Sequence, residues 1–294
     1  MIPRRRFLGT LAAGLGAATL RPARATAALP PEVKSPLGGP IGLQLWSLRN
    51  YLPKDVPGTL ARLRALGIRE VEGAGLAGLS AEAFRRALDA ADLVCHSVHM
   101  DFDRIRKDAA GALKEARTLG ATHLVCPWVP HDGVLTREVA LTAVGVFNAT
   151  GKAARDEGLR FSYHAHGYEF VPSSEGTLFD TIAKLTDPAL VSFEIDLFWA
   201  KAGGVDPATL VGSLPGRVPL LHVKDMKKGL ALPPASSGAP QDSDVAAGTG
   251  QLDFPAIFRA ARKSGTEIFY IEDESTKPWE QIPESLKYLS GLSL

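Results

Sequence analysis

Short apolar runs alternate with longer amphipathic segments along the chain from residue 41 onward. The short runs have the length of strands, and the longer segments space their apolar residues three and four apart, which is typical of helices. Gly67, Gly120 and Gly158 follow three helical segments, at positions where helices commonly end. We therefore expect strands at residues 41–46, 69–72, 93–99, 122–126, 159–164, 190–195, 218–223 and 267–271, and helices at residues 60–66, 81–90, 104–119, 136–157, 177–185, 207–211, 254–263 and 279–289.

Eight strand–helix units within about 250 residues favour an α/β fold of the closed (β/α)8 type, a TIM barrel. The alternative is an open doubly wound sheet, which more often has a glycine-rich phosphate-binding turn after its first strand. Residues 43–48 contain no glycine. The one long irregular insertion, residues 226–250, follows the seventh strand. Because loops on that face of a barrel surround the active site, the insertion is either a lid or a solvated loop.

The first 27 residues differ from the rest of the chain. Arg4, Arg5 and Arg6 precede an uncharged run at residues 7–20, and small residues follow at 23–27. This order is typical of an export signal, and the Arg pair followed by Phe and Leu resembles a twin-arginine signal. A disordered basic tail is the alternative. We expect a signal peptide at 1–27, a linker at 28–40 and a catalytic domain at 41–294, in a periplasmic or otherwise exported protein without a membrane span in its mature form.

Charge and cysteine content limit the possible partners. Residues 1–27 hold five of the 33 basic side chains and none of the 32 acidic ones, so the remainder carries 28 basic and 32 acidic side chains, a net charge of −4. A nucleic-acid groove needs the opposite sign, so we expect no nucleic-acid partner. Cys95 and Cys126 lie in apolar runs, where two buried free thiols are favoured over a disulfide.

Polar residues lie at the ends of four successive predicted strands. Alternation along these strands turns His164, Asp196, His222 and Glu272 toward one side, and the ends of barrel strands meet at one rim. Buried unpaired charges are costly, and a metal ion is the simplest partner that these residues could share. The set of nitrogen and oxygen donors therefore predicts a site for one divalent ion, with Mn²⁺, Co²⁺ or Zn²⁺ favoured over Mg²⁺ by the imidazoles.

Several short motifs carry a resemblance to a known family. They are GLQLWSLR at 42–49, YHAH at 163–166, EID at 194–196, LHVKD at 221–225, GTG at 248–250 and IE at 271–272. In this order the chain resembles the sugar isomerase/epimerase family of xylose-isomerase-like TIM barrels, from residue 41 to about 290.

The resemblance implies one divalent ion bound by His164, Asp196, His222 and Glu272. The family's epimerases usually have a glutamate on the fifth strand, where this chain has His164. That departure places a mechanism with two opposed glutamates in doubt, and the resemblance is closer to exported and inosose-dehydratase-like members. Glu169, in the next loop, could supply a carboxylate.

The chemistry that we expect is proton abstraction next to a sugar carbonyl polarised by the ion. Glu272 is the expected base, and His164 and Lys224 are further catalytic candidates. Lys224 is alternatively a rim charge paired with Asp225. The expected substrate-binding residues are His99, His166, Trp199, Lys224 and Gln44, and Trp46 and Trp128 also lie at strand ends, where aromatic rings can stack on sugars.

Three functions remain open on the sequence alone. The first is a metal-dependent sugar isomerase or epimerase that acts through an enediolate. The second is a metal-dependent lyase or dehydratase that acts on keto-sugars or 3-keto-glycosides. The third is a sugar-binding barrel without catalysis, because a fold alone does not fix a function. All three imply a small carbohydrate as partner, and an oligomer is possible.

Overall fold

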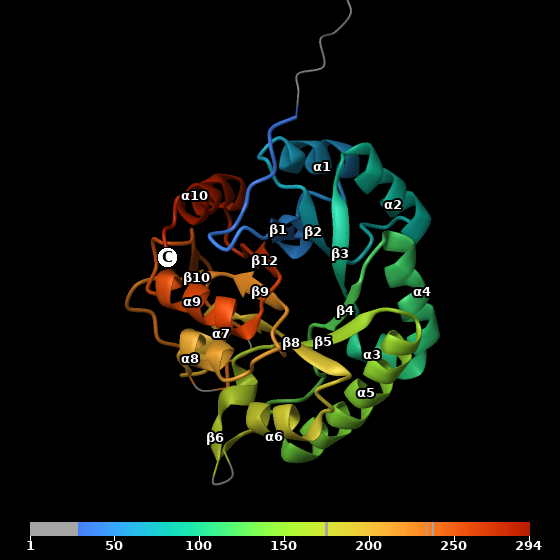
Figure 1. Cartoon of the computed structure of the whole chain (residues 1–294), viewed down its shortest axis with the longest axis vertical. Helices are drawn as coiled ribbons and strands as arrows, with labels where there is room; N and C mark the ends of the chain where they lie inside the picture. The colour runs from blue at the N-terminus through green and yellow to red at the C-terminus, as the bar shows by residue number, and fades with distance from the viewer. Residues whose placement is uncertain (1–28, 174–175, 234, 237) are drawn as a thin grey trace, which may run out of the picture.

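A computed structural model describes residues 29–173, 176–233, 235–236 and 238–294. Eight parallel strands close into a barrel, and helices surround it on the outside (Figure 1). The expected (β/α)8 fold is therefore confirmed. The expected signal peptide at 1–27 lies outside the described residues.

The barrel strands follow chain order around the ring, and the last strand pairs with the first. Each pair is parallel, so all eight carboxyl ends meet at one rim. The strands are β1 (Ile41–Gln44), β2 (Glu70–Ala74), β3 (Val94–His99), β4 (His123–Cys126), β5 (Arg160–Ala165), β8 (Val191–Asp196), β9 (Leu220–Val223) and β12 (Ile268–Ile271).

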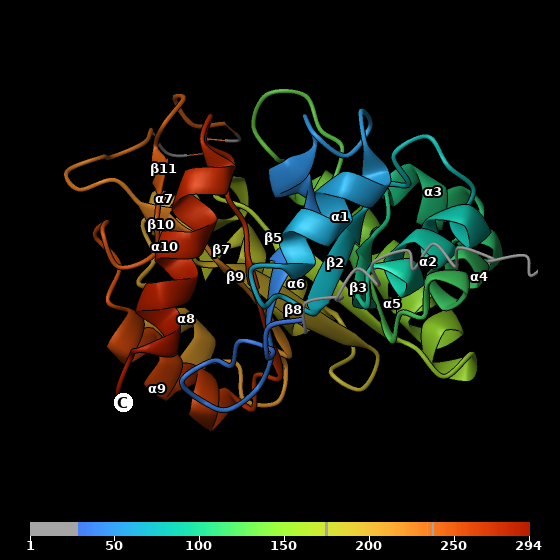
Figure 2. The same cartoon turned by 90° about the horizontal axis from the view of Figure 1, so that it is seen from above.

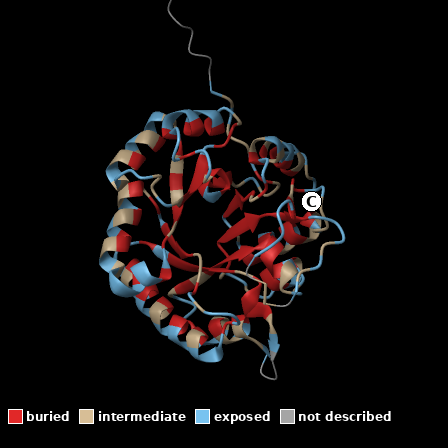
Figure 3. Cartoon of the chain, turned by 180° about the vertical axis from the view of Figure 1, so that it is seen from behind, coloured by how far each residue is buried: buried red, intermediate tan, exposed pale blue. Residues whose placement is uncertain are grey.

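The helices turn their apolar stripes toward the barrel and leave their outer faces in water (Figure 3). Most begin at a residue whose side chain caps the first turn, such as Ser80 for α2 and Thr136 for α5. The helices are α1 (Val56–Arg64), α2 (Ala81–Ala90), α3 (Phe102–Lys107), α4 (Ala109–Leu119), α5 (Arg137–Asp156), α6 (Leu178–Leu185), α7 (Leu197–Ala202), α8 (Pro207–Gly212), α9 (Phe254–Ser264) and α10 (Pro278–Ser290), with the short 3₁₀ turns η1 (Leu45–Leu48) and η2 (Tyr168–Phe170).

Three elements differ from the sequence-based prediction. The strand expected at 41–46 ends at Gln44, and Trp46 lies in the 3₁₀ turn η1 that follows it. The helix expected at 104–119 is broken at Asp108, which leaves helical geometry and whose carboxylate caps Gly111 at the start of α4. Helix α7 was not predicted, because its apolar residues continue the apolar run of β8. Trp199 therefore lies in a helix after the strand end.

Alternation along the strands separates two layers of side chains. On β5, Tyr163 packs outward against Phe147 of α5 with ring centroids 4.6 Å apart, whereas Ser162 and His164 belong to the opposite face. The barrel interior is unusually polar and includes buried Glu70, Glu72, Ser97, His123, Ser162 and Glu194. Cys95 and Cys126 are buried free thiols, and burial raises the pKa of each to about 12.

The segments outside the repeat pack on the barrel. The connector reaches its base, where Val33 donates a backbone hydrogen bond to Gly67 and Arg64 donates to the carbonyl of Pro30. The insertion after β9 begins and ends as a two-stranded ribbon, β10 (Asp225–Met226) and β11 (Asp244–Val245), which lies beside α7 (Figure 2). A second ribbon, β6 (Pro172–Ser173) and β7 (Gly176–Thr177), follows η2. No helix within the described residues has the length and apolarity needed to cross a membrane.

Candidate metal centre and active site

Three side chains converge at the carboxyl-terminal rim of the barrel. Asp196 is the last residue of β8, His222 lies in β9 directly beside it, and Glu272 follows the end of β12. Tyr270 is the register partner of His222, so alternation returns Glu272 to the same face one level higher. One ligand atom from each of the three residues lies within 4.8 Å of the other two.

The donor atoms of this group fit a divalent ion. Nδ1 of His222 lies 3.4 Å from Oε2 of Glu272 and 3.9 Å from Oδ2 of Asp196. Within the described residues, neither that Nδ1 nor that Oδ2 has a hydrogen-bond partner, although both are buried. Buried polar atoms are rarely left without a partner, and one imidazole with two carboxylates suits a divalent cation. The residues present therefore fit the ion that the sequence predicts.

Local helix capping fixes the orientation of Asp196. Its Oδ1 accepts a hydrogen bond from the backbone N–H of Trp199 at 2.9 Å, so the carboxylate caps the first turn of α7. Oδ2 is therefore the oxygen that faces the imidazole of His222. The same side chain starts a helix and supplies a candidate ligand.

His164 lies beside this group and belongs to a deeper one. Its Nδ1 donates to Oε2 of Glu194 at 2.9 Å, and its ring centroid is 4.5 Å from that of His222. The structure groups His164 with His99, Glu194 and His222. Three of the four expected ligands therefore share one site, and Nε2 is the atom through which His164 could join them.

A buried network of carboxylates and imidazoles lies beneath the candidate ion site. Nε2 of His222 donates to Oε2 of Glu72 at 2.7 Å, and His99 lies 2.9 Å from Glu194 and 3.2 Å from Glu72. Ser97 also donates to Glu72. Sequence analysis did not identify Glu72 or Glu194 as site residues. The sequence offered one signal for them, their position. Each lies near the end of a strand, in phase with residues that face the barrel interior.

Charge balance holds this network together. Burial opposes its charged forms, but Glu72 and Glu194 raise the pKa of His99 to about 10, and Glu194 and Glu272 raise that of His222 well above its ordinary value. Despite burial, the imidazoles hold the pKa of Glu194 well below its usual range and lower that of Glu72. In the absence of an ion the network thus pairs carboxylates with imidazolium groups in the barrel interior, and an ion bound at Nδ1 of His222 would replace the proton there.

Lys224 forms a buried ion pair with the expected base. Its Nζ donates to Oε2 of Glu272 at 3.1 Å, also contacts the carboxylate of Glu274, and lies 4.0 Å from Asp196. Burial opposes the charge of Lys224, but these carboxylates raise its pKa well above the ordinary value. Burial likewise opposes the charge of Glu272, yet Lys224 and His222 keep its pKa well below the usual range. Lys224 therefore does not form the rim pair with Asp225.

Asp225 instead anchors the insertion that follows β9. Its Oδ2 accepts from the backbone N–H groups of Gly248 at 2.9 Å and Gly250 at 2.8 Å. Its Oδ1 accepts from those of Met226 at 2.8 Å and Leu252 at 3.2 Å. A side chain at Gly250 would lie 2.3 Å from this carboxylate, which explains the glycine of the GTG motif.

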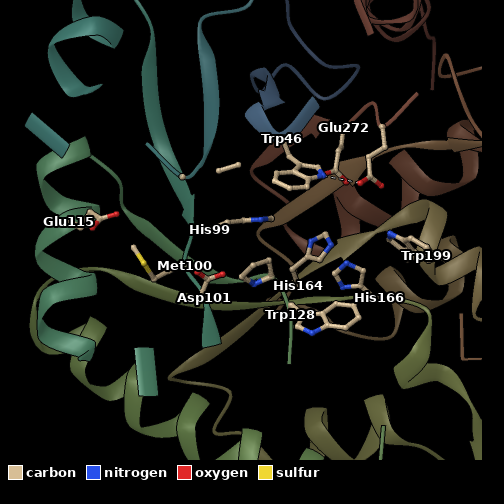
Figure 4. A pocket seen from close by; sticks show the side chains of 14 residues that line it. Trp46, His99, Met100, Asp101, Glu115, Trp128, His164, His166, Trp199 and Glu272 are labelled. Carbon is tan, nitrogen blue, oxygen red and sulfur yellow. Dashed lines mark hydrogen bonds between the residues drawn. The ribbon is translucent and has the colours of Figure 1, made fainter. Parts of the chain in front are cut away.

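A cavity of about 600 Å³ opens above the candidate ion site (Figure 4). Three indole rings, four acidic side chains and three imidazoles contribute to its wall, and the described part of the wall includes no lysine or arginine. Aromatic faces and hydrogen-bonding groups are typical of a site for a small polar ring. The lining residues are Trp46, Ala74, Gly75, His99, Met100, Asp101, Glu115, Pro127, Trp128, His164, His166, Trp199, Glu272 and Glu274.

The cavity includes three of the five expected substrate-binding residues. His99, His166 and Trp199 line it, whereas Lys224 lines the neighbouring cavity. Burial and the charge of His164 lower the pKa of His166 well below its ordinary value, so His166 is neutral.

Two other residues considered from the sequence have structural partners. Gln44 is fully buried, donates its amide to Glu72 at 2.8 Å and accepts from the backbone N–H of Trp46 at 3.0 Å, and it is not among the residues that line the cavity. Glu169 accepts from the hydroxyl of Tyr163 and the backbone N–H of His166, and burial raises the pKa of Glu169 to about 7. Glu169 therefore holds the loop after β5, and it is not part of the cavity wall.

Comparison with known proteins supports the assignment of the fold. The chain is similar to inosose dehydratase of Lacticaseibacillus casei, with 27% identity over 152 residues, which is 48% of this chain. The match spans about half the length of that relative. Among solved structures, a sugar phosphate isomerase/epimerase from Parabacteroides distasonis has a TM-score of 0.70 at 24% identity, over 92% of this chain and 98% of that one.

A second solved structure is a xylose isomerase-like TIM barrel protein from Mycobacterium smegmatis in complex with magnesium. Its TM-score is 0.68 at 18% identity, and the match covers 87% of this chain and 97% of that one. At these identities the structural matches establish the fold. The family model of the xylose isomerase-like TIM barrel matches residues 60–292, and the chain therefore belongs to the xylose isomerase-like TIM barrel family.

Proposed function

We propose that the protein is a divalent-metal-dependent carbon–oxygen lyase that acts on an unphosphorylated keto-sugar and removes the substituent β to its carbonyl. The observation that carries the proposal is the ammonium of Lys224, 3.1 Å from the carboxylate of Glu272. Elimination needs a base at one carbon and an acid at the leaving oxygen, and this pair supplies both. The similarity to an inosose dehydratase supports the same class of reaction.

Asp196, His222 and Glu272 would hold the ion, with His164 as a fourth donor through Nε2. A divalent ion there supplies Lewis-acid stabilisation of the negative charge that develops on the carbonyl oxygen when the neighbouring proton is removed. The imidazole donors favour Mn²⁺, Co²⁺ or Zn²⁺, although a structural neighbour was solved with magnesium.

The proton transfers follow from the two side chains. Glu272 takes the proton from the carbon next to the carbonyl, and the electron pair left behind forms a C=C bond as the β C–O bond breaks. The departing oxygen takes a proton from Lys224, which leaves an unsaturated ketone and a free alcohol or water. Glu272 then returns its proton to Lys224 across 3.1 Å. Acid–base catalysis of this kind contributes roughly 10²–10⁴-fold to a rate.

The cavity wall supports a substrate without phosphate. Within the described lining of the main cavity, Asp101, Glu115, Glu272 and Glu274 are acidic and no lysine or arginine is included, since Lys224 reaches Glu272 and Glu274 from the neighbouring cavity. Proteins bind phosphate groups with arginine, lysine or free backbone N–H groups, so this lining disfavours a phosphorylated sugar.

Isomerisation or epimerisation of the same keto-sugar is the second candidate. It needs the same ion and the same base, followed by return of the proton to a neighbouring position. The position of His166 in the cavity wall favours this candidate, because an imidazole can accept a proton at one ring nitrogen and donate one from the other.

Two 3-keto-glucosides with different leaving groups test the proposal. Methoxide is a poor leaving group that needs an acid, whereas 4-nitrophenolate leaves without one. We expect Lys224→Met to slow elimination from the methyl glycoside by roughly 10²–10⁴-fold and from the 4-nitrophenyl glycoside by less than about tenfold. Exposed Lys227 provides the matched control, since Lys227→Met should change neither rate.

Product analysis by NMR distinguishes the competing functions. Release of the alcohol with an unsaturated ketone supports the lyase. An epimerised or isomerised sugar that keeps its aglycone contradicts the lyase and supports the second candidate. Binding of both glycosides without turnover, in the metal-loaded protein and in Glu272→Gln alike, would indicate a sugar-binding barrel.

A further inference from the structure

A second cavity of about 270 Å³ lies next to the main one, between α7 and the insertion after β9. Trp199 and Glu274 line both cavities, so the two spaces share a wall. Figure 4 shows Trp199 and Glu272 on the side of the main cavity that is away from Glu115. Lys224 lines the second cavity and Glu272 the first, so their ion pair lies across the boundary.

The two cations in the described wall of the second cavity already have hydrogen-bond partners. Lys224 binds Glu272 and Glu274, and Arg49 donates to the backbone carbonyls of Trp46 at 2.9 Å and Glu274 at 3.2 Å. The same wall includes the carboxylates of Asp242, Asp244 and Glu274, so it does not favour an anionic ligand. The wall offers hydrogen-bonding side chains instead, and Asp242 already accepts from the hydroxyl of Thr276 at 3.0 Å.

The apolar part of the wall suits the face of a ring. Phe198 and Trp199 come from the first turns of α7, and Pro240 faces them from the insertion. Aromatic and proline surfaces beside hydroxyl-binding groups favour an uncharged, hydroxylated ring. Ligand sites commonly have volumes of about 300–1,000 Å³, so a cavity of about 270 Å³ is suited to one ring.

We propose that the second cavity is a subsite for a sugar unit linked to the ring in the main cavity, so that the substrates are two-unit glycosides. The inference rests on the proposed function for the main cavity. It adds a second recognition element, in which the linking oxygen lies at the boundary where Lys224 and Glu272 meet. A linked pair of rings would bind more tightly than one ring, because the second ring adds its own contacts.

Binding of keto-sugars of different length tests this subsite. The probes are fructose and three disaccharides that attach one hexose to the same ketose, namely lactulose, turanose and isomaltulose, each titrated by calorimetry into Mn²⁺-loaded protein. We expect at least one disaccharide to bind about tenfold or more tightly than fructose. Ala239→Trp, which fills the second cavity from an exposed loop position, should remove that advantage and leave fructose binding unchanged.

The matched control is Ala231→Trp, an exposed alanine of the same insertion that does not line the cavity. It should bind every probe as the wild type does. The subsite is wrong if fructose binds as tightly as all three disaccharides, or if Ala239→Trp keeps the disaccharide advantage. Absence of binding by every sugar, fructose included, would overturn the carbohydrate function together with the subsite, so the two failures are distinguishable.

Discussion

Glu72 accepts the Nε2–H of His222 at 2.7 Å in the barrel interior. This contact fixes the imidazole in the tautomer whose Nδ1 can accept a metal ion, and turns that Nδ1 toward Asp196 and Glu272. Partners of this kind orient metal-binding histidines and raise their basicity. Glu72 is therefore a positioning residue for the candidate ion site.

Replacement of Glu72 should weaken metal binding. We expect Glu72→Leu to lower the affinity for Mn²⁺ or Zn²⁺ by about 10–100-fold, with a smaller loss in Glu72→Gln, whose amide oxygen still accepts the hydrogen bond. Equilibrium dialysis with elemental analysis measures this directly, without reference to turnover. Protein purified without added metal should contain about one equivalent per chain.

Two comparisons give the metal experiment its controls. The double variant Asp196→Ala, His222→Ala should lose the metal, since two of the three grouped donors are removed. Glu70→Gln changes a glutamate of the same strand that contacts His96 and Tyr270 instead of the ligands, and should keep wild-type affinity. A wild type that holds no metal, even after addition of Mn²⁺, would falsify the ion site.

Gly250→Ala should destabilise the insertion and the fold around it. The added Cβ would lie 2.3 Å from both Oδ1 of Asp225 and the backbone oxygen of Met226, and a backbone atom cannot turn aside as a flexible side chain can. We expect a loss of about 1–3 kcal/mol in the free energy of unfolding, measured by urea denaturation. Gly238→Ala, where nothing lies within 4 Å, should change stability by less than about 0.5 kcal/mol.

The pair of His96 and Glu70 should make stability depend on pH. The hydrogen bond with Glu70 raises the pKa of His96 in the folded protein, so the folded state holds this proton more tightly than the unfolded state does. The stabilisation of the folded state by this pair is complete below the unfolded pKa of His96, about 6.5, and is lost as the pH rises through its folded pKa.

We therefore expect His96→Gln to lower the free energy of unfolding more at about pH 5.5 than at about pH 9. The difference should disappear in a Glu70→Gln background, where the partner charge is gone. An equal effect of His96→Gln at both pH values, or a pH dependence that survives Glu70→Gln, would show that the pair does not act in this way.

The sequence contains enough information to predict the barrel and much of its rim. Eight repeats of strand and helix predicted a closed fold, and alternation predicted that His164, Asp196, His222 and Glu272 would share a face, where the structure groups the last three and places His164 beside them. These predictions held because they depend on periodicity, which is local, and on the parallel closure of the strands, which aligns their ends.

The contacts within the site depend on geometry that the sequence does not display. Glu72 and His222 are 150 positions apart and meet because both side chains point into the closed barrel. Helix α7 was not predicted from the sequence, because its apolar residues continue the apolar run of β8. In the structure its start is marked by the hydrogen bond that Asp196 accepts from the backbone N–H of Trp199. The partner of Lys224 could not be chosen from sequence, since Asp225 is adjacent in the chain but turns to the insertion.

Because Asp225 anchors the insertion, evolutionary change in the middle of the insertion is separated from change at the barrel rim. The ends of the insertion are tied to the barrel by backbone hydrogen bonds to one carboxylate, while Gly238, Ala239, Pro240 and Gln241 are exposed and do not belong to the ion-binding group. Substitutions in that stretch can reshape the second cavity and leave Glu272 and Lys224, the residues proposed for proton transfer, in position. A descendant of this protein could therefore acquire a new substrate range while it keeps the same reaction.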